Sequence, residues 1–368
     1  MFLKTLKLID YRLFSDIDVS FQQGMNVLIG KNSTGKSTIL EAIDFLLNAN
    51  TTVPLEEIIP YAKRTHQNVQ VLVEGVFEMS DIENSNIIAF LKNDDDINLM
   101  RNSHLEIIYS KIITKVDRRF NVTPHIKINP NGIVNNQNLV QQISNYLLPK
   151  IQINNILKVV DQEQELSPQP LLPLGQLTQQ LPYQYALLNQ YVRNLLYKAK
   201  QENIDEYNEI KAKIIDAYPE MIDLDIEFDP NRAQIQIYFV DKKTETKIPL
   251  ESEGMGIREY FYMFLTLYYF SDIIIIKDEA LVHMHKSLLN DFIASIGELK
   301  YQMITTSHIK ELIKTLDFGN IIICRKCDNA ETIVKNLMQV EEMDSVLDEL
   351  GYSIENNIEM SDFLNARE

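Results

Sequence analysis

The chain contains few of the residues that secreted and membrane proteins depend on. Its 368 residues include only two cysteines, Cys324 and Cys327, and no tryptophan. Two cysteines cannot form a disulfide scaffold, and their scarcity fits a reducing compartment. No stretch approaches the roughly 18–20 uninterrupted apolar residues of a membrane span. We therefore expect a cytoplasmic protein without a membrane segment.

Positive charge is also scarce, with 35 basic against 52 acidic side chains and a net charge of −17. Affinity for nucleic-acid backbones comes mainly from clustered lysine and arginine, so we expect the chain alone to bind DNA weakly. One short run is a candidate basic surface, although a solvated strand edge and turn is the favoured interpretation. It consists of Lys111, Lys115, Arg118 and Arg119.

Hydrophobic residues make up 45% of the chain, enough for a folded core. Residues 1–131 show strand patterns around one strong helix, Lys36–Leu47, which follows the apolar strand Met25–Ile29. Residues 132–221 show long helical segments broken by a proline-rich stretch, which predicts a helical insertion. The fold class predicted by this first half is α/β, with an antiparallel β subdomain.

Strand patterns return in the region 222–340, and the final segment, 341–368, predicts a helical tail. Three runs in the third region are apolar enough to be strands buried on both faces. These runs are Ile273–Ile276, Met303–Thr306 and Ile321–Cys324. The four regions 1–131, 132–221, 222–340 and 341–368 therefore predict a mixed sheet with helices, interrupted by the helical insertion.

A phosphate-binding loop lies between the strand Met25–Ile29 and the helix Lys36–Leu47. The sequence Gly-Lys-Asn-Ser-Thr-Gly-Lys-Ser at positions 30–37 fits G-x-x-x-x-G-K-[ST] in the strand–loop–helix context that this mechanism requires. Loop amides would cradle the phosphates of ATP, Lys36 would reach the β and γ oxygens, and the Ser37 hydroxyl would ligate Mg²⁺. The expected nucleotide-binding residues are Gly30, Lys31, Asn32, Ser33, Thr34, Gly35, Lys36, Ser37 and Thr38.

Two adjacent carboxylates, Asp278 and Glu279, follow the apolar strand Ile273–Ile276. Ligand sites of α/β proteins form at the carboxyl ends of strands. Beside a phosphate loop, Asp278 would hold Mg²⁺ and Glu279 would polarise the water that attacks the γ-phosphate. Without that loop, the pair would be an ordinary turn.

Two weaker features complete the candidate site. Ser252 precedes a long apolar helical run, so it can cap that helix, and Gly254 would leave its amide free to approach an anion. His308 follows the strand Met303–Thr306 and is a candidate contact for the γ-phosphate. Taken alone, each is explained by an ordinary capped helix or a structural histidine.

In their order along the chain, these motifs resemble the ATP-binding-cassette ATPase superfamily in its RecF, SMC and OLD-like branch. The opening Leu6–Phe14 is similar to that branch's first strand and turn, with Tyr11 and Arg12 at the Phe and Arg positions. The other matches are Walker A at Gly30–Thr38, the signature at Ser252–Gly256, Walker B at Asp278-Glu279 and the switch histidine at Thr306–His308.

The resemblance implies an ATPase head that forms a homodimer, or a larger even assembly, head to tail around ATP and Mg²⁺. It implies that Glu279 and His308 are catalytic, that Arg12 contacts the nucleotide, and that Ser252 and Gly254 serve the partner's ATP. Residues Ala280–His285 would form the D-loop, which makes His283 and His285 poor metal candidates despite their spacing. Gln67 and Gln70 are both open candidates for the Q-loop.

The chain departs from the family pattern in the signature and after Walker B. It has Glu251 where leucine is usual, Glu253 for the first glycine, Met255 for glutamine and Ala280 for proline. We expect a slow or partner-stimulated ATPase for this reason. Two other features are expected to be incidental, namely the acidic run 94–96, as a solvated loop, and the two cysteines, as surface residues.

Motif spacing separates branches of the family. The segment between Lys36 and Ser252 is much longer than the corresponding segment of a transporter cassette, and only the short segment 309–368 follows His308. We therefore expect no Toprim nuclease domain.

The first functional hypothesis is the switch subunit of a DNA-repair or anti-phage defence complex whose nuclease or toxin is a separate chain. The second is an ATP-gated scaffold or sensor that holds a protein partner without DNA. A P-loop kinase is disfavoured by the signature and switch positions.

Overall fold

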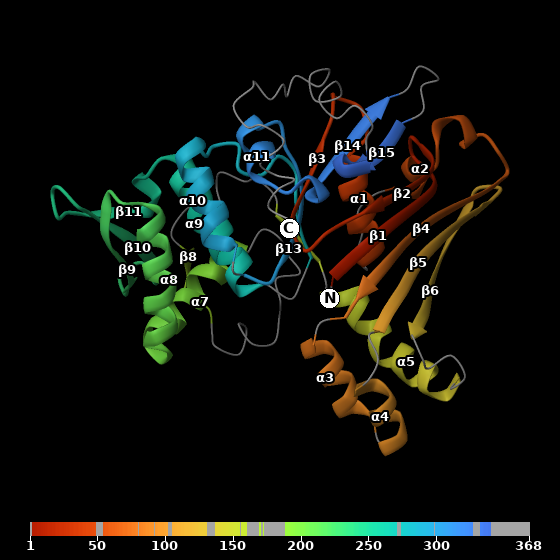
Figure 1. The fold of residues 1–368 in the computed structure, drawn as a ribbon, viewed down its shortest axis with the longest axis horizontal. Helices are drawn as coiled ribbons and strands as arrows, with labels where there is room; N and C mark the ends of the chain where they lie inside the picture. The colour runs from red at the N-terminus through yellow and green to blue at the C-terminus, as the bar shows by residue number, and fades with distance from the viewer. Residues whose placement is uncertain are drawn as a thin grey trace, which may run out of the picture.

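The computed structural model describes most of the chain and shows three sheets. In Figure 1 the antiparallel sheet lies on the right, a six-stranded sheet crosses the middle, and a third small sheet lies with its helices on the left. The described residues are 2–48, 54–79, 81–91, 93–101, 105–130, 137–154, 156–159, 169–170, 172, 188–270, 274–297, 299–326 and 332–339.

The five-stranded sheet is antiparallel, with the order β2-β1-β4-β5-β6. Its strands alternate between buried and exposed side chains, as in β1, where Leu6 and Leu8 point into the core. This sheet is the antiparallel subdomain that the sequence predicts. The strands are β1 (Phe2–Tyr11), β2 (Phe14–Ser20), β4 (Asn68–Glu78), β5 (Leu105–Val116) and β6 (Arg119–Pro130).

The six-stranded sheet has the order β15-β14-β3-β13-β12-β7 and is parallel except for β15. Alternate side chains enter two separate cores: Val27 and Ile275 face one, and Leu28 and Ile276 face the other. Both faces of the sheet are therefore buried, as its apolar strands predict. Its strands are β3 (Gly24–Ile29), β7 (Ile156–Val159), β12 (Ile274–Lys277), β13 (Gln302–Thr306), β14 (Ile321–Lys326) and β15 (Thr332–Asn336).

Helix α1 (Lys36–Leu47) lies between the two larger sheets, in contact with β4 on one side and with β12 and β13 on the other. Most of its side chains are buried, including Ile39 and Phe45. A helix that is covered on both sides needs apolar residues around most of its circumference. This arrangement fixes the start of α1 at the edge where the parallel strands end.

The candidate basic surface is not a single exposed face. Lys111 is buried, and its Nζ donates to the carbonyl oxygens of Phe45 (2.6 Å) and Asn48 (2.9 Å) at the end of α1. Lys115 donates to the carbonyl oxygen of Arg64. Only Arg118 and Arg119 of the run are exposed at the β5–β6 turn. The interpretation as strand edge and turn therefore holds for those two residues alone.

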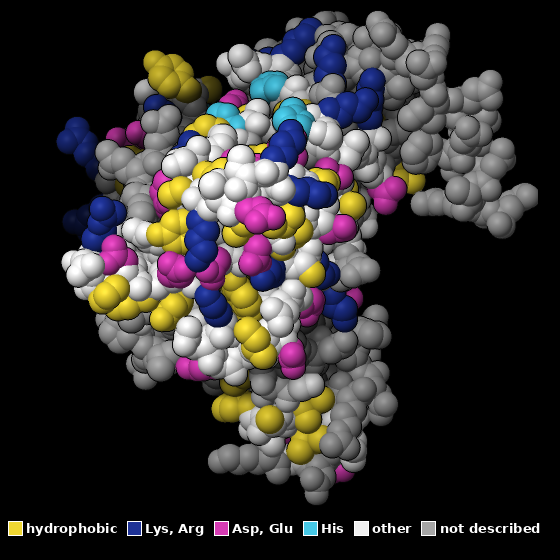
Figure 2. All heavy atoms as spheres, turned by 90° about the vertical axis from the view of Figure 1, so that its left-hand side faces the viewer, with side chains coloured by type: hydrophobic (Ala, Val, Ile, Leu, Met, Phe, Trp, Pro, Cys, Tyr) yellow, Lys and Arg dark blue, Asp and Glu magenta, His cyan; other side chains and the backbone are white. Residues whose placement is uncertain are grey.

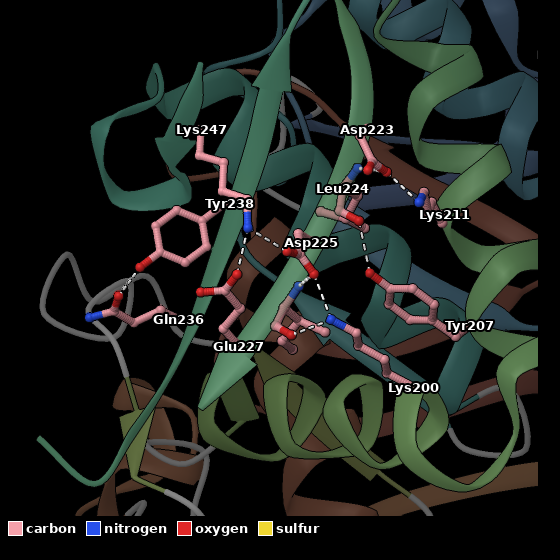
Figure 3. A network of polar contacts seen from close by, with 11 residues as sticks. Lys200, Tyr207, Lys211, Asp223, Leu224, Asp225, Glu227, Gln236, Tyr238 and Lys247 are labelled. Atoms are coloured by element: carbon pink, nitrogen blue, oxygen red, sulfur yellow. Dashed lines mark hydrogen bonds and ion pairs between the residues drawn. The ribbon is translucent and has the colours of Figure 1, made fainter. Parts of the chain in front are cut away.

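The third sheet is built on β10, which pairs with β9 on one side and with β8 and β11 on the other. Figure 3 shows that lysines connect β9 to its neighbours: Lys200 of α7 and Lys247 of β11 both bind Asp225. Lys211 pairs with Asp223 on the same strand. The strands are β8 (Gln169–Pro170), β9 (Met221–Asp229), β10 (Gln234–Asp241) and β11 (Lys247–Pro249).

Helices pack around this third sheet, and α9 contacts both α7 and α10. The helices are α7 (Leu188–Glu202), α8 (Ile204–Ala217), α9 (Met255–Tyr269) and α10 (Lys286–Ile296). The other described α-helices are α2 (Leu55–Ile58), α3 (Asp81–Phe90), α4 (Asp94–Arg101), α5 (Gln137–Asn154) and α11 (Lys310–Thr315).

The region predicted as a helical insertion, 132–221, is not helical throughout. It contains α5, α7 and α8, but also β7, which pairs in parallel with β12. A short apolar run such as β7 does not allow periodicity to separate strand from helix. In addition, α5 contacts β6 and α1, so this part of the region packs against elements of residues 1–131.

Two further expectations concern the acidic run and membrane segments, and a third concerns the C-terminal tail. The acidic run 94–96 begins helix α4, so the expected loop was wrong, and no group of three metal-ligating side chains occurs in the described part of the chain. None of the described helices is both long and apolar enough to cross a membrane. The predicted tail, 341–368, lies outside the described residues.

Candidate functional site

The phosphate loop connects β3 to α1 in the predicted position. At Gly30, with φ of 153°, an added Cβ would collide with the carbonyl oxygen of Cys324 on β14. At Gly35, with φ of 94°, it would come within 2.6 Å of Cζ of Phe14. Both positions therefore require glycine, for backbone conformation and for space. Strand β14 and the β1–β2 turn hold the loop from two sides.

Lys36 lies at the first position of α1 with its ammonium inside the loop. Its Nζ donates to the carbonyl oxygens of Gly30 (2.8 Å) and Lys31 (3.2 Å), and the residue is only 8% exposed. Burial lowers the pKa of Lys36 below its usual value, an effect that nearby Asp278 and Glu279 oppose. An anion entering the loop would meet a preformed, partly desolvated cation.

Ser37 and Asp278 lie side by side although they are far apart in the sequence. The Ser37 hydroxyl donates to Oδ2 of Asp278 at 2.8 Å, and the Thr306 hydroxyl donates to Oδ1. The contact arises because β12 and β3 flank β13 and end at the same edge. A hydroxyl oxygen and a carboxylate oxygen beside a phosphate loop are ligands that suit Mg²⁺. The residues present therefore fit that ion.

Glu279 adopts a left-handed conformation, with φ of 51°, and its side chain is exposed next to Asp278. Its amide donates to Oγ1 of Thr306 at 2.9 Å, and the amide of Ala280 donates to Oγ1 of Thr305 at 3.2 Å. Two threonines at the end of β13 thus hold the turn that follows β12. The turn leaves the Glu279 carboxylate accessible to water.

Arg12 lies in the β1–β2 turn and is tied to two neighbouring elements. Its backbone amide donates to the carbonyl oxygen of Ile58 at 2.6 Å, and its guanidinium pairs with Glu41 on α1. Because the same turn packs Phe14 against Gly35, Arg12 is placed close to the phosphate loop. Its buried Nε has no hydrogen-bond partner among the described residues.

Helix α9 begins at Met255 with Gly254 as its N-cap, so the expectation that Ser252 caps it was wrong. Ser252 instead ends a short 3₁₀ helix, Leu250–Ser252, and is exposed. Ser252 therefore lies two residues before the N-cap position, which Gly254 occupies. A Cβ at Gly254 would meet no atom within 4 Å among the described residues, so the amide end of α9 is open.

Two acidic residues at the signature, Glu251 and Glu253, have charged neighbours. Glu251 accepts a hydrogen bond from Nη2 of Arg193 at 2.6 Å, and Arg193 is fully buried. Sequence reasoning missed Arg193, whose only signal was a charged residue within the apolar pattern of α7. Burial, together with the nearby Asp241 and Glu220 carboxylates, raises the pKa of Glu253.

The remaining candidates differ in their placement. His308 is exposed just after β13, at the same edge as Asp278. Gln70 belongs to β4 and Gln67 precedes it, so both lie with the antiparallel sheet instead of the parallel strands. For the Q-loop, another possible place is the end of β7, because this strand ends beside β12. The chain directly after β7 lies outside the described residues.

The expectation that both cysteines lie at the surface was wrong for Cys324. This residue is fully buried in β14, where its carbonyl packs against Gly30. The apolar run 321–324 contained that signal, because a cysteine in such a strand behaves as a small hydrophobe. Cys327 lies outside the described residues.

Comparisons with known proteins agree with this geometry. A family model described as an AAA ATPase domain matches residues 1–313. Among curated relatives, the DNA replication and repair protein RecF of Pediococcus pentosaceus is 50% identical over 46 residues, 12% of each chain. That of Halalkalibacterium halodurans is 34% identical over 84 residues, 21% of this chain and 20% of its own. The matched segments thus span a fifth or less of these relatives.

Solved SMC head domains share the fold at low sequence identity. A head bound to the C-winged helix domain of ScpA has a TM-score of 0.55 and 13% identity, covering 92% of this chain and 99% of its own. The Pyrococcus furiosus head bound to the C-terminal domain of ScpA has a TM-score of 0.52 and 14% identity, covering 95% and 99%. The SMC heads share the fold, and the family model, which matches most of the chain around the phosphate loop and its carboxylates, shows that the chain belongs to the AAA ATPase domain family.

Proposed function

We propose that this chain binds Mg-ATP at residues 30–38 and hydrolyses it to ADP and phosphate to drive a conformational switch. The observation that carries the proposal is the contact between Ser37 and Asp278, which joins the phosphate loop to the turn after β12. That turn also carries Glu279, which directly follows Asp278. The site therefore combines a phosphate cradle, metal ligands and a candidate base.

Each residue has a proposed role in hydrolysis. Lys36 holds the β- and γ-phosphate oxygens, and Ser37 with Asp278 holds Mg²⁺, which neutralises phosphate charge when bound. Glu279 accepts a proton from the attacking water. The water oxygen bonds to the γ-phosphorus while the bond from the γ-phosphorus to the bridging β-phosphate oxygen breaks. His308 donates a hydrogen bond to the γ-phosphate.

We further propose that two copies assemble head to tail, as a homodimer or as part of a larger even oligomer. Ser252 is exposed and the amide end of α9 at Gly254 is open, which supports contact with an ATP held by the partner. Glu253 adds negative charge at this contact. We therefore propose that turnover is slow until a partner protein stimulates it.

The proposed role is that of the switch subunit in a DNA-repair or anti-phage defence complex that has its nuclease or toxin on a separate chain. The similarity of short segments to RecF, named for DNA replication and repair, supports the DNA-associated part. The chain itself would contribute little DNA affinity, because its net charge is −17. Over the middle of the face in Figure 2, basic and acidic side chains are interspersed.

A second candidate is an ATP-gated scaffold that holds a protein partner without DNA. The net charge favours it, as does the SMC head of the same fold that is bound to a ScpA domain. Affinity purification of Glu279→Gln in Mg-ATP from the native host would separate the two. Nuclease-sensitive DNA together with a nuclease or toxin chain supports the first candidate, and a protein partner alone supports the second.

The ATPase itself is tested with two substitutions. Lys36→Ala should abolish ATP binding, because it removes the cation inside the loop. Glu279→Gln should keep ATP binding, lose hydrolysis by about 100-fold or more, and accumulate as an ATP-bound dimer. Fluorescent-nucleotide titration, phosphate release and light scattering after size-exclusion chromatography measure these effects. Hydrolysis by Glu279→Gln at the wild-type rate would contradict the assignment of the base.

A further inference from the structure

The turn that follows β12 contains two residues in the left-handed region. Glu279 has φ of 51° and Leu281 has φ of 68°, and neither is glycine. L-residues rarely adopt this conformation, and they keep it only where surrounding contacts impose it. The threonines of β13 bind the amides of Glu279 and Ala280, at the start of the turn, so the second half needs other contacts.

Glu259 on α9 binds this second half. Its Oε1 accepts from the amide of Leu281 at 2.8 Å, and its Oε2 accepts from the amide of His283 at 3.1 Å. The Glu259 side chain is 9% exposed, and Nζ of buried Lys277 lies 3.9 Å from Oε1. A single carboxylate that is mostly shielded from water therefore holds two amides of the turn.

Helix α9 also approaches the turn closely at Gly256. A Cβ there would come within 2.5 Å of the carbonyl oxygen of His283. The first turns of α9, which start at the open end near Gly254, thus contact the turn directly. A shift of α9 would move Glu259 and with it the chain that leads back to Glu279.

We propose that Glu259 is a positioning residue that couples the signature turn to the Glu279 carboxylate of the same chain. The proposal rests on the proposed function, in which Ser252 and Gly254 contact the partner's ATP and Glu279 acts on the chain's own ATP. Engagement of the partner at the start of α9 then sets the geometry of the base through Glu259. Each ATP site of the dimer thereby responds to occupancy of the other.

The test compares Glu259→Ala and Glu259→Gln with Tyr260→Phe. Tyr260 is the next residue on α9, and its hydroxyl bonds to Oγ of Ser295 on α10 at 3.2 Å, so Tyr260→Phe removes a contact of this helix away from the turn. For Glu259→Ala we expect kcat to fall by about tenfold or more with KM for ATP within about twofold, because the phosphate loop is untouched. Glu259→Gln keeps an acceptor oxygen and should be intermediate. Tyr260→Phe should retain the wild-type kcat.

Amide exchange provides a readout that a purely stabilising role would not change. In the Glu279→Gln protein, the amides of Leu281 and His283 should exchange more slowly with Mg-ATP than without it. Adding Glu259→Ala should abolish that difference. Unchanged kcat in Glu259→Ala, or an ATP effect on exchange that survives it, would overturn the coupling.

Failure of the coupling and failure of the proposed function give different results. If the wild-type protein hydrolyses ATP and Glu259→Ala does so equally fast, only the coupling fails. If the wild-type protein neither hydrolyses ATP nor dimerises with it, the proposed function fails and takes the coupling with it. Faster exchange at positions 281 and 283 in Glu259→Ala would then still identify the carboxylate as the group that holds the turn.

Discussion

At the scale of single residues, the phosphate loop depends on one close contact between backbones. Gly30 lies against the carbonyl oxygen of Cys324, so no side chain fits between the loop and β14. The motif spacing predicts the glycine, but the strand that covers it comes much later in the chain and could not be inferred from local pattern.

Gly30→Ala should therefore weaken both folding and ATP binding. The added methyl group would displace β14 or the loop, and we expect a loss of about 1–3 kcal/mol in unfolding free energy. Gly254→Ala is the matched control for stability, because its Cβ would meet no described atom within 4 Å, and it should stay within about 0.5 kcal/mol of wild type. Urea unfolding and fluorescent-nucleotide titration measure the two effects. Equal stability of the two variants would show that the contact has no energetic weight.

Lys111 gives a prediction about pH. Burial lowers its pKa from 10.5 to about 8, although nearby Asp44 opposes the shift. Between these two pKa values the unfolded chain holds this proton more fully than the folded chain, so the contribution of Lys111 to stability rises with pH. The free energy of unfolding of wild type minus that of Lys111→Met should therefore increase from about pH 7.5 to about pH 9.5. Parallel pH profiles would contradict this prediction.

At the scale of elements, α9 is connected to its surroundings by charged side chains at buried positions. Arg193 of α7 joins Glu251 to Tyr262, and Lys277 lies beside Glu259. The apolar pattern predicted a buried helix here, but its polar residues carry no periodicity that reveals their partners. By contrast, local pattern predicted β3 and α1 well. The spacing of the phosphate loop marks the end of β3 and the start of α1, and the apolar runs mark the elements themselves.

Removing one partner of the Arg193–Glu251 pair should destabilise the protein more than removing both. Arg193→Met leaves the partly exposed Glu251 without that cation and should cost about 1–3 kcal/mol in unfolding free energy. Arg193→Met with Glu251→Leu removes both charges and restores the leucine usual in the family, so it should recover at least half of that loss. Denaturant unfolding of both single variants and the double variant provides the cycle. Additive losses would show that the two side chains are not coupled.

At the scale of the whole molecule, the six-stranded sheet separates two cores and carries the site at its edge. The family and the site motifs could be predicted because each motif is a short, contiguous run of residues. The order of the strands could not, since β3 lies between β13 and β14, which both come from the distant second half of the chain. The contact between Ser37 and Asp278 is a product of that order.

Net charge also belongs to this scale. The chain alone, with a charge of −17, should retain little DNA in Mg-ATP, and any retention should fall steeply between about 50 and 200 mM salt. Fluorescence anisotropy with labelled duplex measures this. Tight binding that persists at about 200 mM salt would indicate a basic surface that the overall charge conceals.

The strand order also has a consequence for synthesis. When β3 and the phosphate loop leave the ribosome, neither neighbouring strand of β3 has been made, and Asp278 has not been made either. An interrupted translation product would therefore carry the loop without Asp278, the carboxylate that we propose as a metal ligand. The proposed Mg-ATP site is complete only after β12 and β13 have joined β3. Bound nucleotide would therefore stabilise molecules that have already assembled the sheet, and it would not stabilise the first half of the chain while that half folds.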